Sequence, residues 1–131
     1  MRVLIVEDDF FVGNLVEDQL RDDGHQVVGR VSSASAARDL VVESRPDLML
    51  VDINLDDGET GCVFAHEVRE KLNIPTIFIT GSPAKARACD DAFGVLVKPF
   101  APSSVSAALD AAEVIKAGGK PLKAPAGLEL F

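Results

Sequence analysis

The sequence PDLMLVDINLDDGETG (residues 46–61) decides the fold, because it contains a continuous apolar run that ends abruptly on a carboxylate. Residues 48–51 have the length and composition of a strand that is buried on both faces, as in a parallel sheet. The Asp- and Gly-rich residues that follow are typical of a loop. Asp52 is therefore predicted at the carboxyl end of a central strand, which is the edge of an α/β sheet where ligands bind. Taken alone, Asp52 could equally open a loop with no further role.

The rest of the chain alternates between stretches with strand character and stretches with helical spacing of apolar residues. Four more strands are predicted at residues 2–6, 25–31, 75–79 and 93–97. Helices are predicted at residues 10–20, between Ser32 and Pro46, and at 61–72 and 102–117, while residues 82–91 favour at most two helical turns. This alternation predicts a five-stranded, doubly wound parallel α/β sheet with right-handed crossovers. Residues 1–117 form one domain in this interpretation, and the Pro-, Gly- and Ala-rich residues 118–131 form a flexible tail.

Composition limits the class of protein. The 131 residues are 47% apolar and 26% charged, which is typical of one globular domain. The net charge of -8 argues against binding to nucleic acid, whose phosphates require clustered basic residues. No apolar run reaches the roughly 18 residues of a membrane span, and no leader segment is evident. Cys62 and Cys89 have no CxxC spacing, which disfavours a zinc site or a disulfide framework and predicts reduced thiols in the cytoplasm.

Polar residues stand at the ends of four predicted strands. They are Glu7, Asp8 and Asp9 after the first, Asp52 at the third, Thr80 at the fourth and Lys98 at the fifth. Since parallel strands direct their carboxyl ends to the same edge, we expect these side chains to converge. Each has a simpler explanation when taken singly: Asp8 or Asp9 could cap the following helix, Thr80 could be a strand-end hydroxyl, and Lys98 a solvated charge. Four consistent strand ends favour a shared site.

The chemistry of such a cluster points to phosphoryl transfer. Carboxylates in one pocket repel one another unless a cation is shared, and Mg²⁺ suits a site with few carboxylates that is completed by phosphate oxygens. Asp52 could attack a phosphoryl group as a nucleophile. Lys98 would then neutralise one transferred oxygen, and the Thr80 hydroxyl would hold another.

Four motifs, VEDD (6–9), VDINL (51–55), ITG (79–81) and VKPF (97–100), resemble the receiver domain of two-component response regulators over residues 1–116. The resemblance implies a flavodoxin-like sheet with strand order 2-1-3-4-5. It also implies a phosphorylation-dependent signalling protein that accepts a phosphoryl group on Asp52 from a histidine kinase or a histidine phosphotransfer protein.

The resemblance assigns further roles residue by residue. Glu7 and Asp8 form the acidic pair, and Mg²⁺ is held at Glu7, Asp8, Asp52 and the backbone carbonyl of Asn54. Thr80 and Lys98 act as the switch residues. A cis peptide bond is expected between Lys98 and Pro99.

The sequence departs from the family pattern in three places. Val95 stands where the family usually has an aromatic switch residue, so a ring movement coupled to Thr80 must use another side chain, such as Phe93, or be absent. The segment between Thr80 and Lys98 is short, which predicts a stunted fourth helix. The loop 52–61 lacks the common Pro-Gly turn and carries additional acidic residues.

Several functions are compatible with an aspartyl nucleophile. The preferred one is a stand-alone receiver that is not an enzyme and that acts through an unknown downstream protein or as a phosphate relay or sink. The alternative is an aspartyl-phosphate phosphohydrolase, but Asn54 stands where those enzymes have a second Asp as general acid. A flavin carrier is disfavoured by the absence of Trp and Tyr and of a phosphate-cradling Gly-rich loop. A receiver that is not phosphorylated is disfavoured by the presence of Asp52, Thr80 and Lys98 together.

Overall fold

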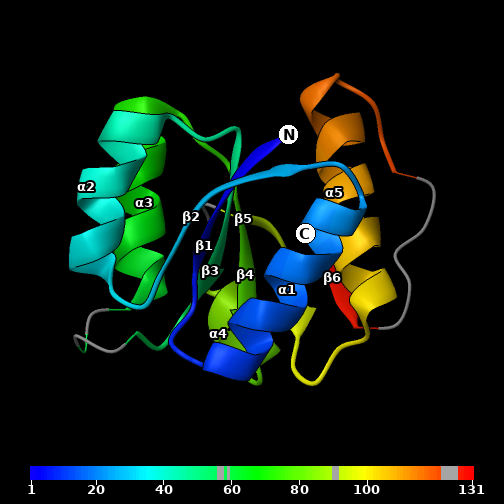
Figure 1. Ribbon diagram of the computed structural model, residues 1–131, viewed down its shortest axis with the longest axis horizontal. Helices are drawn as coiled ribbons and strands as arrows, with labels where there is room; N and C mark the ends of the chain where they lie inside the picture. The colour runs from blue at the N-terminus through cyan, green and yellow to red at the C-terminus, as the bar shows by residue number, and fades with distance from the viewer. Residues whose placement is uncertain (56–57, 59, 90–91, 122–126) are drawn as a thin grey trace.

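The sheet has the predicted parallel core. The computed structural model describes residues 1–131 except 56, 57, 59, 90, 91 and 122–126. Five parallel strands pair in the order β2-β1-β3-β4-β5 (Figure 1), which confirms the flavodoxin-like prediction. Their bounds are β1 Arg2–Val6, β2 Gln26–Val31, β3 Leu48–Asp52, β4 Thr76–Thr80 and β5 Ala92–Val97. All five residues of β3 are buried, as a central strand covered on both faces requires.

Helices cover both faces of the sheet (Figure 1). The helices are α1 Phe10–Asp22, α2 Ala34–Ser44, α3 Gly61–Leu72, α4 Pro83–Arg87 and α5 Pro102–Lys116. One hydrophobic core lies between the sheet and α2, α3 and α4, and the other lies between the sheet and α1 and α5. Strand β1 serves both cores because its side chains alternate, with Leu4 and Val6 in the first and Val3 and Ile5 in the second. Among the described residues, no helix combines the length and the apolar character needed to span a bilayer.

Two expectations about the second half of the chain are confirmed. Helix α4 has only five residues, as the short segment between Thr80 and Lys98 predicts. The Lys98–Pro99 peptide bond is cis. The additional acidic residues of the 52–61 loop, Asp56, Asp57 and Glu59, lie outside the described residues.

The predicted flexible tail is wrong for its last residues. Leu128–Leu130 forms a sixth strand, β6, which pairs antiparallel with β5. Leu128 is buried in the core beneath α5, and Glu129 faces the opposite side, where its carboxylate accepts hydrogen bonds from Arg87 at 2.7 and 2.8 Å. Gly94 of β5 permits this approach, because a Cβ there would lie 2.8 Å from the backbone oxygen of Glu129. Strand β6 therefore covers the β5 edge of the sheet, whose unpaired backbone groups attract a partner strand.

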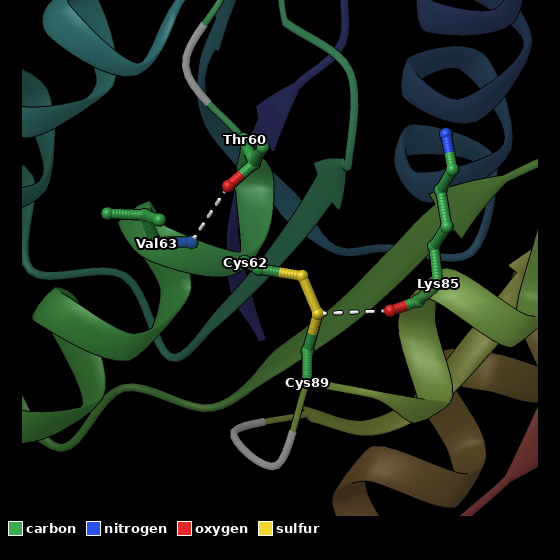
Figure 2. The surroundings of a disulfide bond; sticks show 5 residues. All are labelled: Thr60, Cys62, Val63, Lys85 and Cys89. Carbon is green, nitrogen blue, oxygen red and sulfur yellow. Dashed lines mark hydrogen bonds between the residues drawn. A yellow bond between two sulfur atoms is a disulfide. The ribbon is translucent and has the colours of Figure 1, made fainter.

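The predicted reduced thiols are also wrong in this structure, which joins Cys62 and Cys89 by a disulfide (Figure 2). Cys62 lies in the first turn of α3, and Cys89 follows α4. The two cysteines are 27 residues apart in the sequence, so their spacing gives no sign that the start of α3 and the end of α4 are neighbours.

Candidate functional site

The first strand delivers two acidic side chains to the carboxyl edge of the sheet and uses a third for a structural purpose. The Glu7 backbone N–H donates to the carbonyl of Val31, so residue 7 still follows the sheet, and its side chain is buried. Asp8 is exposed at the start of the loop. Asp9 is the N-cap of α1 and accepts from the backbone N–H groups of Phe11 and Val12 at 2.9 and 3.2 Å. The capping explanation therefore holds for Asp9.

The central strand places Asp52 beside them. Asp52 is the last residue of β3 and only 5% exposed. Its Oδ1 accepts from the backbone N–H of Asn54 at 3.1 Å, which fixes the carboxylate and brings the Asn54 backbone next to it. Gly61 has a role that the sequence did not suggest: a Cβ at this position would collide with the backbone oxygen of Asp52. Gly at the first position of α3 thus allows the helix to begin directly over the strand end.

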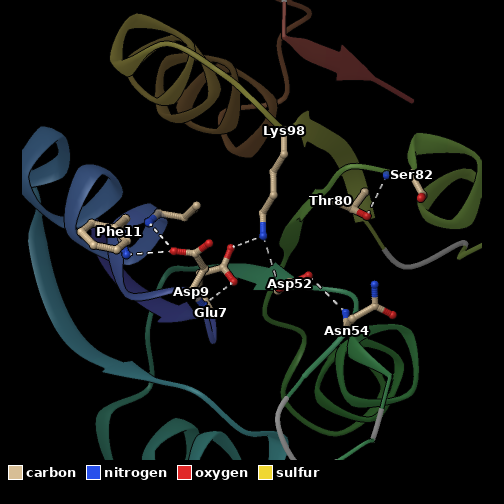
Figure 3. Close-up of polar contacts among 9 residues, drawn as sticks. Glu7, Asp9, Phe11, Asp52, Asn54, Thr80, Ser82 and Lys98 are labelled. Atoms are coloured by element: carbon tan, nitrogen blue, oxygen red, sulfur yellow. Dashed lines mark hydrogen bonds and ion pairs between the residues drawn. The ribbon is translucent and has the colours of Figure 1, made fainter.

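Lys98 reaches this acidic cluster from β5 (Figure 3). Its Nζ lies 2.8 Å from Glu7 Oε1 and 3.4 Å from Asp52 Oδ2. Burial lowers the pKa of Lys98, but the nearby Glu7 and Asp52 carboxylates raise it more, so the net pKa is above its ordinary value. The ammonium group is therefore a fixed positive charge at the centre of the site.

Thr80 lies at the same edge, on the other side of Lys98 from Glu7 (Figure 3). It ends β4 and is 1% exposed. Its Oγ1 accepts from the backbone N–H of Ser82 at 3.1 Å, and its carbonyl accepts from the Lys98 backbone N–H at 2.9 Å. The hydroxyl is thus engaged by the loop that leads to α4, and the ends of β4 and β5 are tied together.

Neither Val95, which stands at the family's aromatic switch position, nor Phe93, the suggested substitute, lies at this edge. Val95 is fully buried in the core beneath α2, α3 and α4. Phe93 is near the amino end of β5, whereas Thr80 pairs with Val97 at the carboxyl end. Four residues of strand separate Phe93 from that pairing, or about 13 Å. Phe93 therefore does not replace the missing ring beside Thr80.

The residues present fit a hard divalent cation. Glu7, Asp8 and Asp52 each offer a carboxylate oxygen, and these oxygens lie within 4.8 Å of one another. The buried Glu7 Oε1 has no hydrogen-bond partner of suitable geometry among the described residues, although the Lys98 ammonium is close to it. An all-oxygen set of three clustered carboxylates suits Mg²⁺. Glu7, Asp8 and Asp52 are the side chains available to hold it, and the part expected of the Asn54 carbonyl stays a prediction.

The buried position of Glu7 beside Asp52 changes its pKa. Burial, and then its contact with Asp52, raise the pKa of Glu7 from 4.5 to about 8. Between these values the folded protein retains a proton that the unfolded chain has lost. Without a divalent cation, the contribution of Glu7 to the free energy of unfolding should therefore be fully present below pH 4.5. This contribution should be lost as the pH rises through about 8.

Glu7→Gln should remove this pH dependence, because glutamine does not titrate. We expect the melting temperature of the metal-free protein to fall more steeply between pH 5.5 and 8 than that of Glu7→Gln, with the exposed substitution Glu43→Gln as control. Mg²⁺ should raise the melting temperature of the unsubstituted protein, and increasingly so toward pH 8, because it competes with the Glu7 proton. Parallel pH profiles for the two proteins, or equal melting with and without Mg²⁺, would argue against the site.

Comparison with known proteins agrees with this geometry. The family model for the response regulator receiver domain matches residues 3–110. The chain belongs to the response regulator receiver family. The sheet order and helix arrangement are those of solved receiver domains.

Individual relatives are regulators. The chain is 33% identical over 114 residues to the phyllosphere-induced regulator PhyR of Methylorubrum extorquens, an alignment that covers 84% of this receiver and 42% of PhyR. The crystal structure of the response regulator PhyR from Brucella abortus has a TM-score of 0.82 at 29% identity, covering 89% of this chain and 49% of that one. The chemotaxis response regulator CheY4 of Vibrio cholerae has a TM-score of 0.75 at 28% identity, with 85% and 97% covered. This receiver thus spans less than half of the curated PhyR that it matches.

Proposed function

We propose that this receiver is a phosphorylation-dependent signalling protein in which Asp52 accepts a phosphoryl group from a histidine kinase or a histidine phosphotransfer protein. The observation that carries the proposal is that the Lys98 ammonium lies 2.8 Å from Glu7 Oε1 and 3.4 Å from Asp52 Oδ2, although the three residues come from the ends of three different strands. A nucleophilic carboxylate, an acidic pair and a fixed cation are the groups that phosphoryl transfer needs. The family match favours this function over the phosphohydrolase alternative.

The groups divide the work of the transfer. The Asp52 Oδ2 lone pair attacks phosphorus while the bond from phosphorus to the donor nitrogen breaks, and the electron pair leaves with that nitrogen. Lys98 neutralises one phosphoryl oxygen, and the Thr80 hydroxyl turns from the Ser82 N–H to donate to another. Glu7, Asp8, Asp52 and the Asn54 carbonyl would hold Mg²⁺, and the bound ion would supply the remaining charge neutralisation.

Engagement of Thr80 offers a route from phosphorylation to output. The Ser82 N–H donates a hydrogen bond to Thr80 Oγ1. When the hydroxyl turns toward the phosphoryl group, this hydrogen bond is broken. The loop before α4 then rearranges. A downstream protein that recognises the rearranged loop would bind the phosphorylated form, although the same chemistry also serves a relay or sink.

The donor has an apolar surface to recognise next to the site. Phe10 and Phe11, at the start of α1, are 63% and 82% exposed. Phe11 also lines a shallow groove of about 250 Å³ with Lys98, Pro99 and Phe100. Exposed aromatic side chains at the edge of a reactive site are typical of a protein interface. We place the phosphodonor on this surface because the groove is lined by Lys98, which contacts Asp52.

Intact mass spectrometry after treatment with acetyl phosphate and Mg²⁺ tests the proposal. We expect the receiver to gain the mass of one phosphoryl group, and EDTA to prevent the gain. Absence of any gain, or a gain that EDTA leaves unchanged, would contradict it. Steady release of phosphate from unrelated phosphate monoesters would instead support the phosphohydrolase alternative.

A further inference from the structure

The two cysteines join the start of α3 to the residue that follows α4 (Figure 2). Cys62 is half-buried at the second position of α3, and Cys89 is 8% exposed just after α4. Their Cα atoms are 5.7 Å apart, which is an ordinary span for a disulfide. The backbone therefore needs no displacement to hold the two sulfurs either bonded or side by side as thiols.

The surroundings accommodate the reduced state as well as the oxidised one. Cys89 Sγ lies 3.2 Å from the backbone carbonyl oxygen of Lys85, which can accept a hydrogen bond from the thiol once the disulfide is reduced. A thiolate at Cys62 would lie in the first turn of α3, where the partial positive charge at the helix N-terminus stabilises negative charge. Cys62 also lines an open groove with Val63, so a thiol from solution can reach its sulfur.

The bond fixes a segment that is otherwise weakly held. Helix α4 has five residues, of which Ala86 alone is buried, and its N-cap Ser82 makes no side-chain capping hydrogen bond. Its other side-chain anchor is the exposed ion pair of Arg87 with Glu129, and exposed ion pairs contribute little. The disulfide joins the residue just after α4 covalently to the start of α3, and α4 lies on the segment between Thr80 and the strand that leads to Lys98.

We propose that Cys62 and Cys89 form a reversible thiol–disulfide site that controls whether α4 can move. Oxidation by a small-molecule disulfide, such as oxidised glutathione, transfers two electrons: one cysteine thiolate attacks the disulfide and releases one thiol, and the second cysteine then attacks the mixed disulfide and releases the other. The two protons from Cys62 and Cys89 leave with the two released thiols. The oxidised receiver holds α4 against α3, and the reduced receiver releases it.

The first measurement concerns the redox site alone. The receiver is equilibrated in buffers with different ratios of reduced to oxidised glutathione, its free thiols are alkylated, and its intact mass is measured. Amide hydrogen exchange is then measured in the oxidised and the reduced form. We expect both forms to be populated across the series, and residues 83–88 to exchange at least about fivefold faster in the reduced form, while β1 and β3 are unchanged. Equal exchange in this segment would overturn the inference, as would a pair that never responds to glutathione.

The second measurement concerns signalling and rests on the proposed function. Both forms are phosphorylated with acetyl phosphate, and exchange in residues 83–88 is compared before and after. We expect phosphorylation to speed exchange in the reduced form and to leave the oxidised form unchanged. An equal response in both forms would overturn the control of α4. Failure of both forms to take up phosphate would count against the proposed function, and the first measurement would then decide the redox site.

The double variant Cys62→Ser, Cys89→Ser should behave as the reduced form in any buffer. The comparison of the oxidised and reduced forms of the unsubstituted chain does not depend on how well this variant folds.

Discussion

Asp52→Asn is expected to abolish phosphoryl uptake from acetyl phosphate, because an amide oxygen is a far weaker nucleophile than a carboxylate and one of the three clustered acidic groups is lost. The measurement is the intact mass of the protein after incubation with Mg²⁺. A variant that fails to fold would also take up no phosphoryl group. The melting temperature of each sample is therefore recorded to show that the protein is folded.

Asp9→Asn is the matched control for this variant. Asp9 lies two residues after Glu7, but its carboxylate caps α1, and asparagine caps a helix about as well as aspartate. The control should therefore take up the phosphoryl group normally. If uptake persists in Asp52→Asn, the acceptor must be sought elsewhere, first at Asp8.

Lys98→Met should slow phosphorylation by roughly 10²- to 10³-fold, the usual cost of removing one fixed group that stabilises the transition state. Lys98 Nζ is 3.4 Å from Asp52 Oδ2, so it is placed to neutralise charge on the transferred group. The rate is measured from the time course of the mass gain. Lys71→Met, on the exposed side of α3, is the control and should leave the rate unchanged.

The effect of Mg²⁺ on the Lys98→Met protein separates two roles of this residue. Lys98 is a cation and cannot be a metal ligand, so the rise in melting temperature with Mg²⁺ should be retained or increased. A variant that loses its response to Mg²⁺ would show that Lys98 organises the acidic cluster. A phosphorylation rate within about twofold of the original would remove its assigned role in transfer.

The sequence predicted the parallel core and the convergence of the site because both depend on the direction of the strands. Apolar runs that end on Glu7, Asp52 and Lys98 could be placed at one edge without knowing any distance. The short α4 was predicted from the number of residues between Thr80 and Lys98. These features follow from local composition and from the geometry of parallel sheets.

Features that depend on contacts between distant segments were not predicted. The disulfide requires the start of α3 and the end of α4 to be neighbours, which no spacing reveals. The β6 pairing depends on a bare edge at β5 and on Gly94, where a side chain would obstruct the incoming strand. The role of Gly61 beneath Asp52 was missed for the same reason, although a Gly at the first position of a helix that follows a reactive strand end is a usable signal.

Strand β6 also changes how this receiver can meet other molecules. With the β5 border occupied by Leu128–Leu130, the border strands of the sheet among the described residues are β2 and the three-residue β6. A peptide or a second molecule that extends the sheet would therefore add at β2 or along the short β6, and would reach β5 only by displacing Leu128–Leu130.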